Sequence, residues 1–269
     1  MSQLLLEKVI MYVVSKFPIF HSVSLAHQSR ITGASQGIGR AIAIECAQHV
    51  NRSRTWKPFC LRLVLCEMHE NQLQVLYTLA LTLPDAGKRL IDLAVSTFGR
   101  VDGIVHNAGI AQFIDFGAVT KQQLDKHLSV NFGGPFAITQ AVTSQMIAQG
   151  FGGSVISIAS VTATTGSSQL AHYAATKAAV LGMTVNGGVA LGKHGIRFNA
   201  VSPGTITTSI NEADLGGPKR AAMEGRVPLG RLGVPVDIAK PVVFFLSDMA
   251  QYVSGQNLIV DGAATVFYQ

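Results

Sequence analysis

Short apolar runs alternate with longer segments of helical periodicity from Gly99 onward, and this alternation constrains the fold more than any other feature of the chain. The apolar runs have the length of buried strands and lie at 103–106, 154–158, 197–201 and 257–260. One long helix is predicted over 171–191, and another begins after Thr120, where Gln123 completes a capping-box pattern. The sequence therefore predicts an α/β fold with one doubly wound parallel sheet and helices on both of its faces.

The composition suits a single globular domain. The chain has 269 residues, of which 48% are hydrophobic and 13% are charged, so it has ample material for a core. A doubly wound α/β domain can fill this length alone. We therefore expect residues 1–269 to form one domain.

Charge, apolar stretches and cysteine content bear on the partners and on the location of the protein. The net charge is +6, but the basic residues are scattered and form no block of about five or six, so no nucleic-acid partner is expected. The apolar stretches at 4–6 and 9–14 are shorter than the ~20 residues of a membrane span, so no membrane association is expected. Cys46, Cys60 and Cys66 are odd in number and form no C-x-x-C pair, which favours a reducing, cytoplasmic location.

Small and polar residues follow three of the predicted strands. They are His106-Asn107-Ala108-Gly109, Ala159-Ser160 and Ser202-Pro203-Gly204. Ligands of open α/β sheets bind at the carboxyl ends of the strands, so these three segments predict a binding site at one edge of the sheet.

A glycine-rich segment, G-x-x-x-G-x-G over 33–39, precedes a helical pattern over 40–48. Such a loop lets backbone N–H groups approach a pyrophosphate at the amino end of a helix. Together with the predicted sheet, it favours a Rossmann-type dinucleotide site. A glycine-rich turn that binds no ligand is the alternative for this segment taken alone.

Tyr173 and Lys177 are four residues apart on the predicted helix and therefore share one of its faces. A neighbouring ammonium lowers the pKa of a phenol, which would allow Tyr173 to exchange a proton with a substrate hydroxyl. Ser160 at a strand end offers a hydroxyl that can hold the substrate oxygen. Tyr12 and Lys16 have the same spacing but lack a helical apolar pattern and an upstream hydroxyl, so spacing alone is a weak signal.

In combination, these motifs resemble those of the short-chain dehydrogenase/reductases over residues 31–262. The resemblance implies NAD or NADP as cofactor and a small-molecule substrate. It implies catalytic roles for Asn131, Ser160, Tyr173 and Lys177. It implies cofactor binding by Gly33, Ser35, Gln36, Gly37, Ile38, Gly39, Asn107, Ala108, Gly109, Tyr173, Lys177, Pro203, Gly204, Ile206 and Thr208.

The family resemblance also implies a mechanism and an assembly. Tyr173 would take the hydroxyl proton, Ser160 would hold the oxygen, and Lys177 would lower the pKa of the tyrosine and bind the nicotinamide ribose. Asn131 would support a proton relay behind the lysine. The resemblance further implies a homotetramer or homodimer assembled through the helices after Thr120 and after Ala171.

Substrate choice in this family lies mainly in the segment after the Pro-Gly element, here 205–231, which is expected to form a helical lid. Parts of the sequence over 190–231 are similar to fungal L-rhamnose 1-dehydrogenases, which oxidise the anomeric hydroxyl of a free sugar to a lactone. The prediction is an NAD(P)-dependent oxidoreductase acting on a sugar or secondary alcohol. The alternatives are a carbonyl reductase of the 3-oxoacyl type and a family member whose cofactor site is impaired.

Two segments, 11–30 and 50–82, depart from the family pattern. The first separates the expected leading strand, which resembles 4–10, from the glycine loop. The second would carry the acidic residues beside the adenine, and there only Glu67 fits. Basic residues in the same region leave NAD against NADP open. No metal site is expected, because His106 and His172 have no carboxylate or cysteine at metal-ligand spacing.

Overall fold

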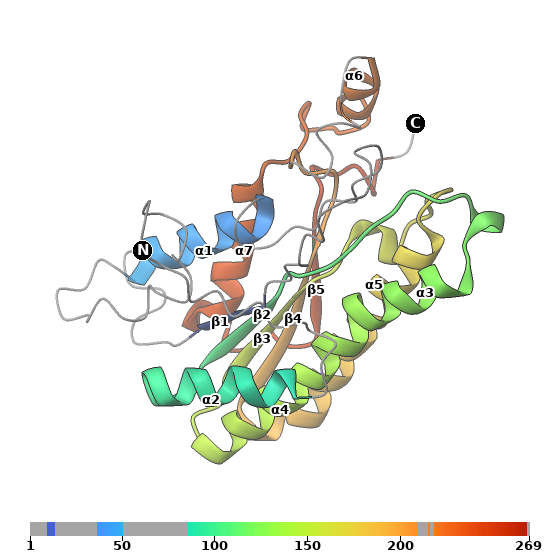
Figure 1. The fold of residues 1–269 in the computed structure, drawn as a ribbon. Helices are drawn as coiled ribbons and strands as arrows, with labels where there is room; N and C mark the ends of the chain where they lie inside the picture. The colour runs from blue at the N-terminus through green and yellow to red at the C-terminus, as the bar shows by residue number, and fades with distance from the viewer. Residues whose placement is uncertain (1–9, 14–36, 51–84, 209–214, 216–217, 268–269) are drawn as a thin grey trace, which may run out of the picture.

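The computed structural model describes residues 10–13, 37–50, 85–208, 215 and 218–267. At its centre, five parallel strands lie in the order β1-β2-β3-β4-β5 (Figure 1). Their bounds are β1 Ile10–Val13, β2 Gly103–His106, β3 Gly153–Ile158, β4 Ile196–Pro203 and β5 Gln256–Val260. All four strands predicted from apolar runs are confirmed, as is the doubly wound parallel sheet.

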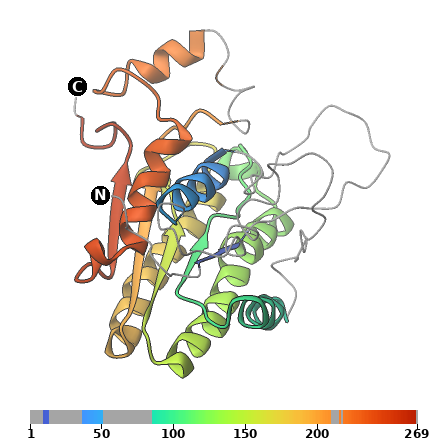
Figure 2. The ribbon, with the colours of Figure 1, turned by 90° about the vertical axis from the view of Figure 1, so that its left-hand side faces the viewer.

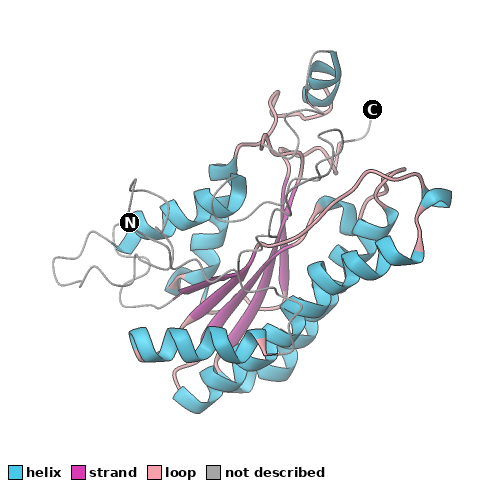
Figure 3. Ribbon diagram, in the orientation of Figure 1, coloured by secondary structure: helices cyan, strands magenta, loops and turns pink. Residues whose placement is uncertain are grey.

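Helices cover both faces of this sheet (Figures 1 and 2). One face carries α2 (Ala86–Phe98), α4 (Gly134–Gln149) and α5 (Ala171–Leu191), and the other carries α1 (Gly37–Val50) and α7 (Pro235–Leu246). Figure 3 shows the magenta strands between these two helical layers. The shorter helices are α3 (Lys121–Leu128) and α6 (Pro218–Glu224).

Alternate strand residues face the two helical layers because side chains alternate across a β-strand. Ile104 and Val155 pack with α2 and α4, whereas their neighbours Val105 and Ile156 pack with α1 and α7. On the α1 side, Ile42 is fully buried and lies in one cluster with residues of α7. The helix that follows the glycine loop is therefore held in place by a helix near the carboxyl terminus.

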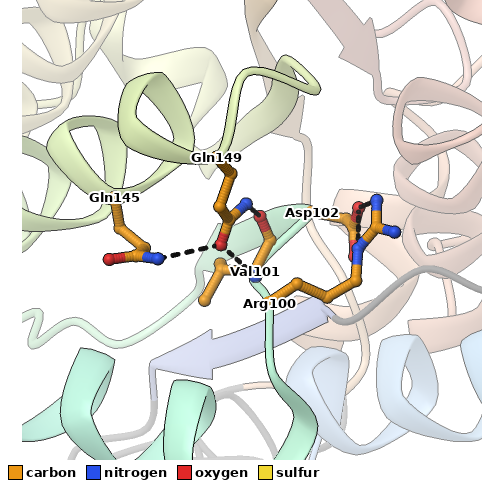
Figure 4. A network of polar contacts seen from close by, with 5 residues as sticks. All are labelled: Arg100, Val101, Asp102, Gln145 and Gln149. Atoms are coloured by element: carbon orange, nitrogen blue, oxygen red, sulfur yellow. Dashed lines mark hydrogen bonds and ion pairs between the residues drawn. The ribbon is translucent and has the colours of Figure 1, made fainter.

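The start of β2 is fixed to α4 by one glutamine side chain (Figure 4). Gln149 Oε1 accepts a hydrogen bond from the backbone N–H of Val101 at 2.9 Å, and its Nε2 donates to the Val101 carbonyl at 2.8 Å. Gln145 supports the same oxygen at 3.1 Å. Arg100 and Asp102 on either side form an ion pair, with Arg100 Nε 3.0 Å from both carboxylate oxygens. This network ties β2 to the end of a helix.

The helix predictions hold in detail. The helix predicted over 171–191 is α5, and the capping box at Thr120 is formed, with Gln123 N–H donating to Thr120 Oγ1 at 3.3 Å and Thr120 N–H donating to Gln123 Oε1 at 2.9 Å. The helix predicted over 40–48 extends over 37–50. No helix in the described part of the chain combines the length and apolar character needed to cross a membrane.

The amino-terminal prediction needs one correction. The atypical segment 11–30 begins inside a strand, because Met11–Val13 belong to β1 and pair with β2. Tyr12 is therefore in a strand and not on a helix, which removes the competing Y-x-x-x-K pair. The rest of that segment, with Lys16, and 51–82, with Glu67, lie outside the described residues.

Candidate active site

The polar residues predicted at strand ends meet at the carboxyl edge of the sheet. β2 leads into Asn107 and Gly109, β3 leads into Ser160, and β4 ends at Pro203. Because the strands are parallel and adjacent, their ends lie at one edge, and the first turns of α5 bring Tyr173 to the same place. The predicted constellation is assembled in space.

Ser160 caps a short 3₁₀ turn, η4 (Val161–Ala163), and is only 9% exposed. Its Oγ accepts two hydrogen bonds, from the backbone N–H of Thr162 at 3.2 Å and from Thr162 Oγ1 at 2.9 Å. Sequence reasoning missed Thr162. The signal was present, because a hydroxyl residue that ends a strand commonly caps the turn that follows.

The pKa of the Tyr173 phenol is raised, which is opposite to the direction expected from a neighbouring ammonium. Burial raises its pKa to about 12, although a hydrogen bond with Ser160 acts in the opposite direction. The expected depression of this pKa by Lys177 is not found. Lys177 Nζ lies 5.5 Å from the centre of the tyrosine ring and is directed to the Ile158 carbonyl, so burial dominates.

Lys177 is buried, at 5% exposure, and its Nζ donates to the Ile158 carbonyl at 2.7 Å. Burial lowers its pKa to about 8, because a charged ammonium loses hydration inside the protein. An ammonium carries three N–H donors, so hydrogen-bonding capacity remains beyond the bond to Ile158. That capacity suits the hydroxyls of a ribose.

Asn131 lies in one turn of π-helix, η3 (Ser129–Gly133), between α3 and α4. Its Oδ1 accepts from the Ile110 N–H at 2.8 Å, and its Nδ2 donates to the Ile110 carbonyl at 2.9 Å and to Thr176 Oγ1 at 3.0 Å. Thr176 in turn donates to the Tyr173 carbonyl at 2.7 Å. Asn131 thus links the loop after β2 to the helix that carries Tyr173. Sequence reasoning missed Ile110 and Thr176.

A buried, unpaired amide and two closely packed glycines lie at this edge of the sheet. A Cβ at Gly109 would lie 3.3 Å from Asn131 Oδ1 and 3.6 Å from Lys177 Nζ, and one at Gly204 would lie 2.6 Å from Asp261 Cβ, so glycine at these positions lets protein segments pack closely around the site. Asn107 Nδ2 is buried and has no hydrogen-bond partner among the described residues. A buried polar group of this kind is normally satisfied by a ligand or by water, so Asn107 fits a polar group of a bound dinucleotide.

The glycine loop is described only in part. Gly33, Ser35 and Gln36 lie outside the described residues. Gly37 begins α1 with φ 59°, a left-handed conformation that favours glycine, and Ile38 packs against the core cluster that contains α7.

Three other residues predicted to bind the cofactor differ in burial. Ala108 and Ile206 are buried in the core, at 5% and 3% exposure, whereas Thr208 is partly exposed. Thr207 N–H donates to the Gly233 carbonyl at 2.8 Å, and Gly233 N–H donates to the Thr205 carbonyl at 3.0 Å. These bonds bring together the two ends of the segment that was expected to form a lid.

That segment contains α6, which has no buried residue and projects from the body of the molecule (Figure 1). The part that follows α6 packs on the chain after β5, where Leu229 N–H donates to the Gly262 carbonyl at 3.3 Å. A Cβ at Gly262 would lie 2.5 Å from Val227 Cγ1. The expected helix in this segment is present.

The histidines near the site contact a threonine hydroxyl or another histidine ring. His106 Nε2 lies 2.8 Å from Thr139 Oγ1, whose own proton goes to the Pro135 carbonyl, so the histidine is the donor. The rings of His127 and His172 meet edge to face at 4.3 Å. Within the described residues, no group of three or more His, Cys, Asp or Glu side chains is arranged to hold a metal ion.

Comparisons with known proteins agree with this geometry. A family model described as enoyl-(acyl carrier protein) reductase matches residues 33–265. The L-rhamnose-1-dehydrogenase of Scheffersomyces stipitis is 43% identical over 247 residues, covering 89% of this chain and 96% of that protein. The L-rhamnose 1-dehydrogenase (NAD(P)(+)) of a Sphingomonas species is 42% identical over 251 residues, with the same two coverages.

A solved structure is also similar to this chain in both sequence and fold. The crystal structure of a short-chain type dehydrogenase/reductase from Mycobacterium marinum superposes with a TM-score of 0.74 at 31% identity, covering 87% of this chain and 94% of that one. This match includes sequence as well as fold, and the residues matched by the family model, 33–265, include β2 to β5 and the site described above. This chain belongs to the short-chain dehydrogenase/reductase family.

Proposed function

We propose that this protein is an NAD(P)-dependent dehydrogenase that oxidises a hydroxyl of a sugar, with the anomeric hydroxyl of L-rhamnose as the first candidate. The observation that carries the proposal is the meeting of Ser160, Tyr173 and Lys177 at the carboxyl edge of the sheet. The names of the two relatives that are 43% and 42% identical support the choice of sugar.

The proposed reaction needs one base, one hydrogen-bond donor and one hydride acceptor. A bound nicotinamide cofactor would accept the hydride from the carbon that carries the hydroxyl. Tyr173, as phenolate, would take the hydroxyl proton, and Ser160 would donate a hydrogen bond to the same oxygen as its charge develops. The carbon–hydrogen and oxygen–hydrogen bonds break, and a carbonyl forms, which in a cyclic sugar oxidised at the anomeric carbon is a lactone.

Lys177 would bind the cofactor in this scheme. Its buried ammonium donates to the Ile158 carbonyl and keeps further N–H donors for the hydroxyls of the nicotinamide ribose. Because burial raises the pKa of Tyr173 to about 12, the phenolate fraction at neutral pH is small. Oxidation should therefore accelerate as the pH rises, whereas the reverse reduction, which uses the phenol, should not.

Cofactor binding is assigned to residues around the same edge. We propose that Asn107 and Gly109 line the cofactor after β2, and that Pro203, Gly204, Ile206 and Thr208 form the nicotinamide end. The glycine segment 33–39 would hold the pyrophosphate at the amino end of α1. NAD and NADP are both candidates, because the residues expected beside the adenine lie outside the described part of the chain.

The decisive experiment is a substrate panel read by nicotinamide absorbance. L-rhamnose, L-lyxose, L-mannose and simple secondary alcohols are each supplied with NAD and with NADP. Turnover of L-rhamnose above that of the alcohols supports the proposal, and absence of turnover with every sugar rejects it. Tyr173→Phe should reduce turnover by about a thousandfold or more, whereas Tyr252→Phe, at a fully exposed tyrosine, should not change it.

We also propose a cytoplasmic homo-oligomer, a tetramer or a dimer. Support comes from exposed apolar residues on the two long helices, with Phe136 and Ile147 on α4 and Val185 and Val189 on α5. Val185 and Val189 are 51% and 81% exposed and four residues apart on α5, so their side chains form one apolar patch on the surface of the helix. Val189→Glu should lower the mass measured by sedimentation, and an unchanged mass would exclude α5 as the interface.

A further inference from the structure

Thr162 makes both hydrogen bonds that the Ser160 oxygen accepts. Its backbone N–H donates at 3.2 Å and its hydroxyl donates at 2.9 Å. A serine hydroxyl has two acceptor lone pairs and one proton. When both lone pairs are engaged, the proton is the only remaining means by which Ser160 can bond to another group.

The direction of that remaining bond matters for the proposed reaction. The Ser160 hydroxyl acts to lower the pKa of Tyr173, as a group that donates to a phenolate does. With both lone pairs engaged by Thr162, Ser160 can offer a neighbouring oxygen only its proton. During oxidation the substrate oxygen becomes negative as its proton leaves. A group that donates stabilises this oxygen, whereas one that accepts would oppose the charge.

We propose that Thr162 is a positioning residue that fixes the Ser160 hydroxyl as a hydrogen-bond donor toward the substrate oxygen. This inference rests on the proposed dehydrogenase function. The two donations to Ser160 also polarise its O–H bond, which strengthens the bond that Ser160 donates in turn. Thr162 itself would touch neither substrate nor cofactor.

The turn around Thr162 does not need the threonine hydroxyl in order to form. Its backbone is closed by Ala163 N–H donating to the Ser160 carbonyl and by Thr164 N–H donating to the Val161 carbonyl, both at 3.0 Å. Thr165 Oγ1 adds a bond to the Val161 carbonyl at 2.9 Å. The hydroxyl of Thr162 is thus available for a task other than holding the turn.

The test uses Thr162→Val, which removes the hydroxyl and keeps the backbone N–H. We expect kcat to fall roughly tenfold, the effect of one lost hydrogen bond, while KM stays within about twofold. Thr162→Ser should restore most of the rate. Thr165→Val is the matched control, because it removes a hydroxyl from the same turn that does not bond to Ser160, and it should leave kcat unchanged.

A double mutant separates positioning from simple damage. If Thr162 acts through Ser160, adding Thr162→Val to Ser160→Ala should cost no further activity, because the group that it orients is gone. An additional tenfold loss in that background would overturn the inference. So would a Thr162→Val enzyme with wild-type kcat, and neither result would touch the assignment of Tyr173.

A second readout does not depend on turnover. In protein labelled at the tyrosine Cζ carbon, the Tyr173 resonance is identified by its absence in Tyr173→Phe. Thr162→Val and Ser160→Ala should move this resonance in the same direction, and Thr165→Val should leave it in place. If wild-type protein oxidises none of the substrates, the proposed function fails, and this resonance alone decides whether Thr162 orients Ser160.

Discussion

Asn131 bonds to both backbone groups of Ile110, accepting from the N–H at 2.8 Å and donating to the carbonyl at 2.9 Å. A side-chain amide has the same donor and acceptor groups as a peptide unit, so it pairs with the loop as a neighbouring strand would. Asn131 is 2% exposed. The loop that follows β2 is therefore held at a fixed distance from the π-helical turn.

Removing this amide should destabilise the protein. Asn131→Ala leaves the Ile110 N–H and carbonyl without their partner, so we expect the free energy of unfolding to fall by about 2–4 kcal/mol. Urea unfolding measures this change. The control is Asn186→Ala, which removes an exposed amide that bonds to the Gly182 carbonyl and should cost less than about 1 kcal/mol. Equal losses in both variants would contradict the assigned role.

Lys177 should reduce stability at neutral pH. Its pKa is about 8 in the folded protein against an ordinary value of 10.5, so between these values the unfolded chain binds a proton that the folded chain does not. Stability then rises with pH, by about 2 kcal/mol between pH 7 and pH 10. Lys177→Met should abolish activity, raise the free energy of unfolding at pH 7 and flatten this rise. The comparison is made by chemical denaturation at both pH values, with Lys240→Met, at an exposed lysine, as control.

Acid should destabilise the protein through His106. Burial lowers its pKa from 6.5 to about 4, so below pH 6.5 the unfolded chain takes up a proton that the folded chain excludes. The resulting loss is about 2 kcal/mol between pH 7 and pH 5. His106→Gln keeps a donor near Thr139 and removes the titrating ring, so this variant should lose less stability over that interval. An identical pH dependence in the two proteins would assign the effect to other groups.

Two glycines of α5 should respond to alanine in opposite directions. A Cβ at Gly187 would lie 2.5 Å from ring atoms of Phe198, whereas at Gly182 nothing among the described residues lies within 4 Å. Gly182→Ala should raise the free energy of unfolding by roughly 1 kcal/mol through helix propensity, and Gly187→Ala should lower it by about 1–3 kcal/mol through overpacking. Thermal unfolding distinguishes the two. Destabilisation by both would mean that the Gly182 side of α5 is covered, as in an oligomer.

The strands and α5 were predictable because their signals are local. Apolar runs bounded by glycine and polar residues predicted β2 to β5. The separation of four residues predicted that Tyr173 and Lys177 lie on one face of α5. The π-helical turn at Asn131 was not predicted, because Gly133, Gly134 and Pro135 indicate a helix break and do not distinguish a π turn from any other interruption. The pKa of Tyr173 was predicted in the wrong direction, since spacing reports a shared face and says nothing of how deeply that face is buried.

The residues that hydrogen-bond to the catalytic side chains could not be predicted from local sequence patterns. Ile110 and Thr176 bond to Asn131 only because the chain brings three separate segments together. Thr162 bonds to Ser160 because the turn between them places the two hydroxyls together. A spacing of two residues is compatible with this bond but does not by itself predict it. The sequence indicated which residues carry chemistry more readily than which residues hold them in place.

The packing of α1 against α7 has a consequence for synthesis of the chain. Ile42 and Cys46 on α1 are buried in one cluster with Ile238 and Val242 on α7. A ribosome that adds about 5–20 residues per second makes α7 on the order of ten seconds or more after α1. During that interval the apolar side of α1 is exposed on the nascent polypeptide, so we expect chaperone binding there and slow completion of the half of the fold that serves the cofactor.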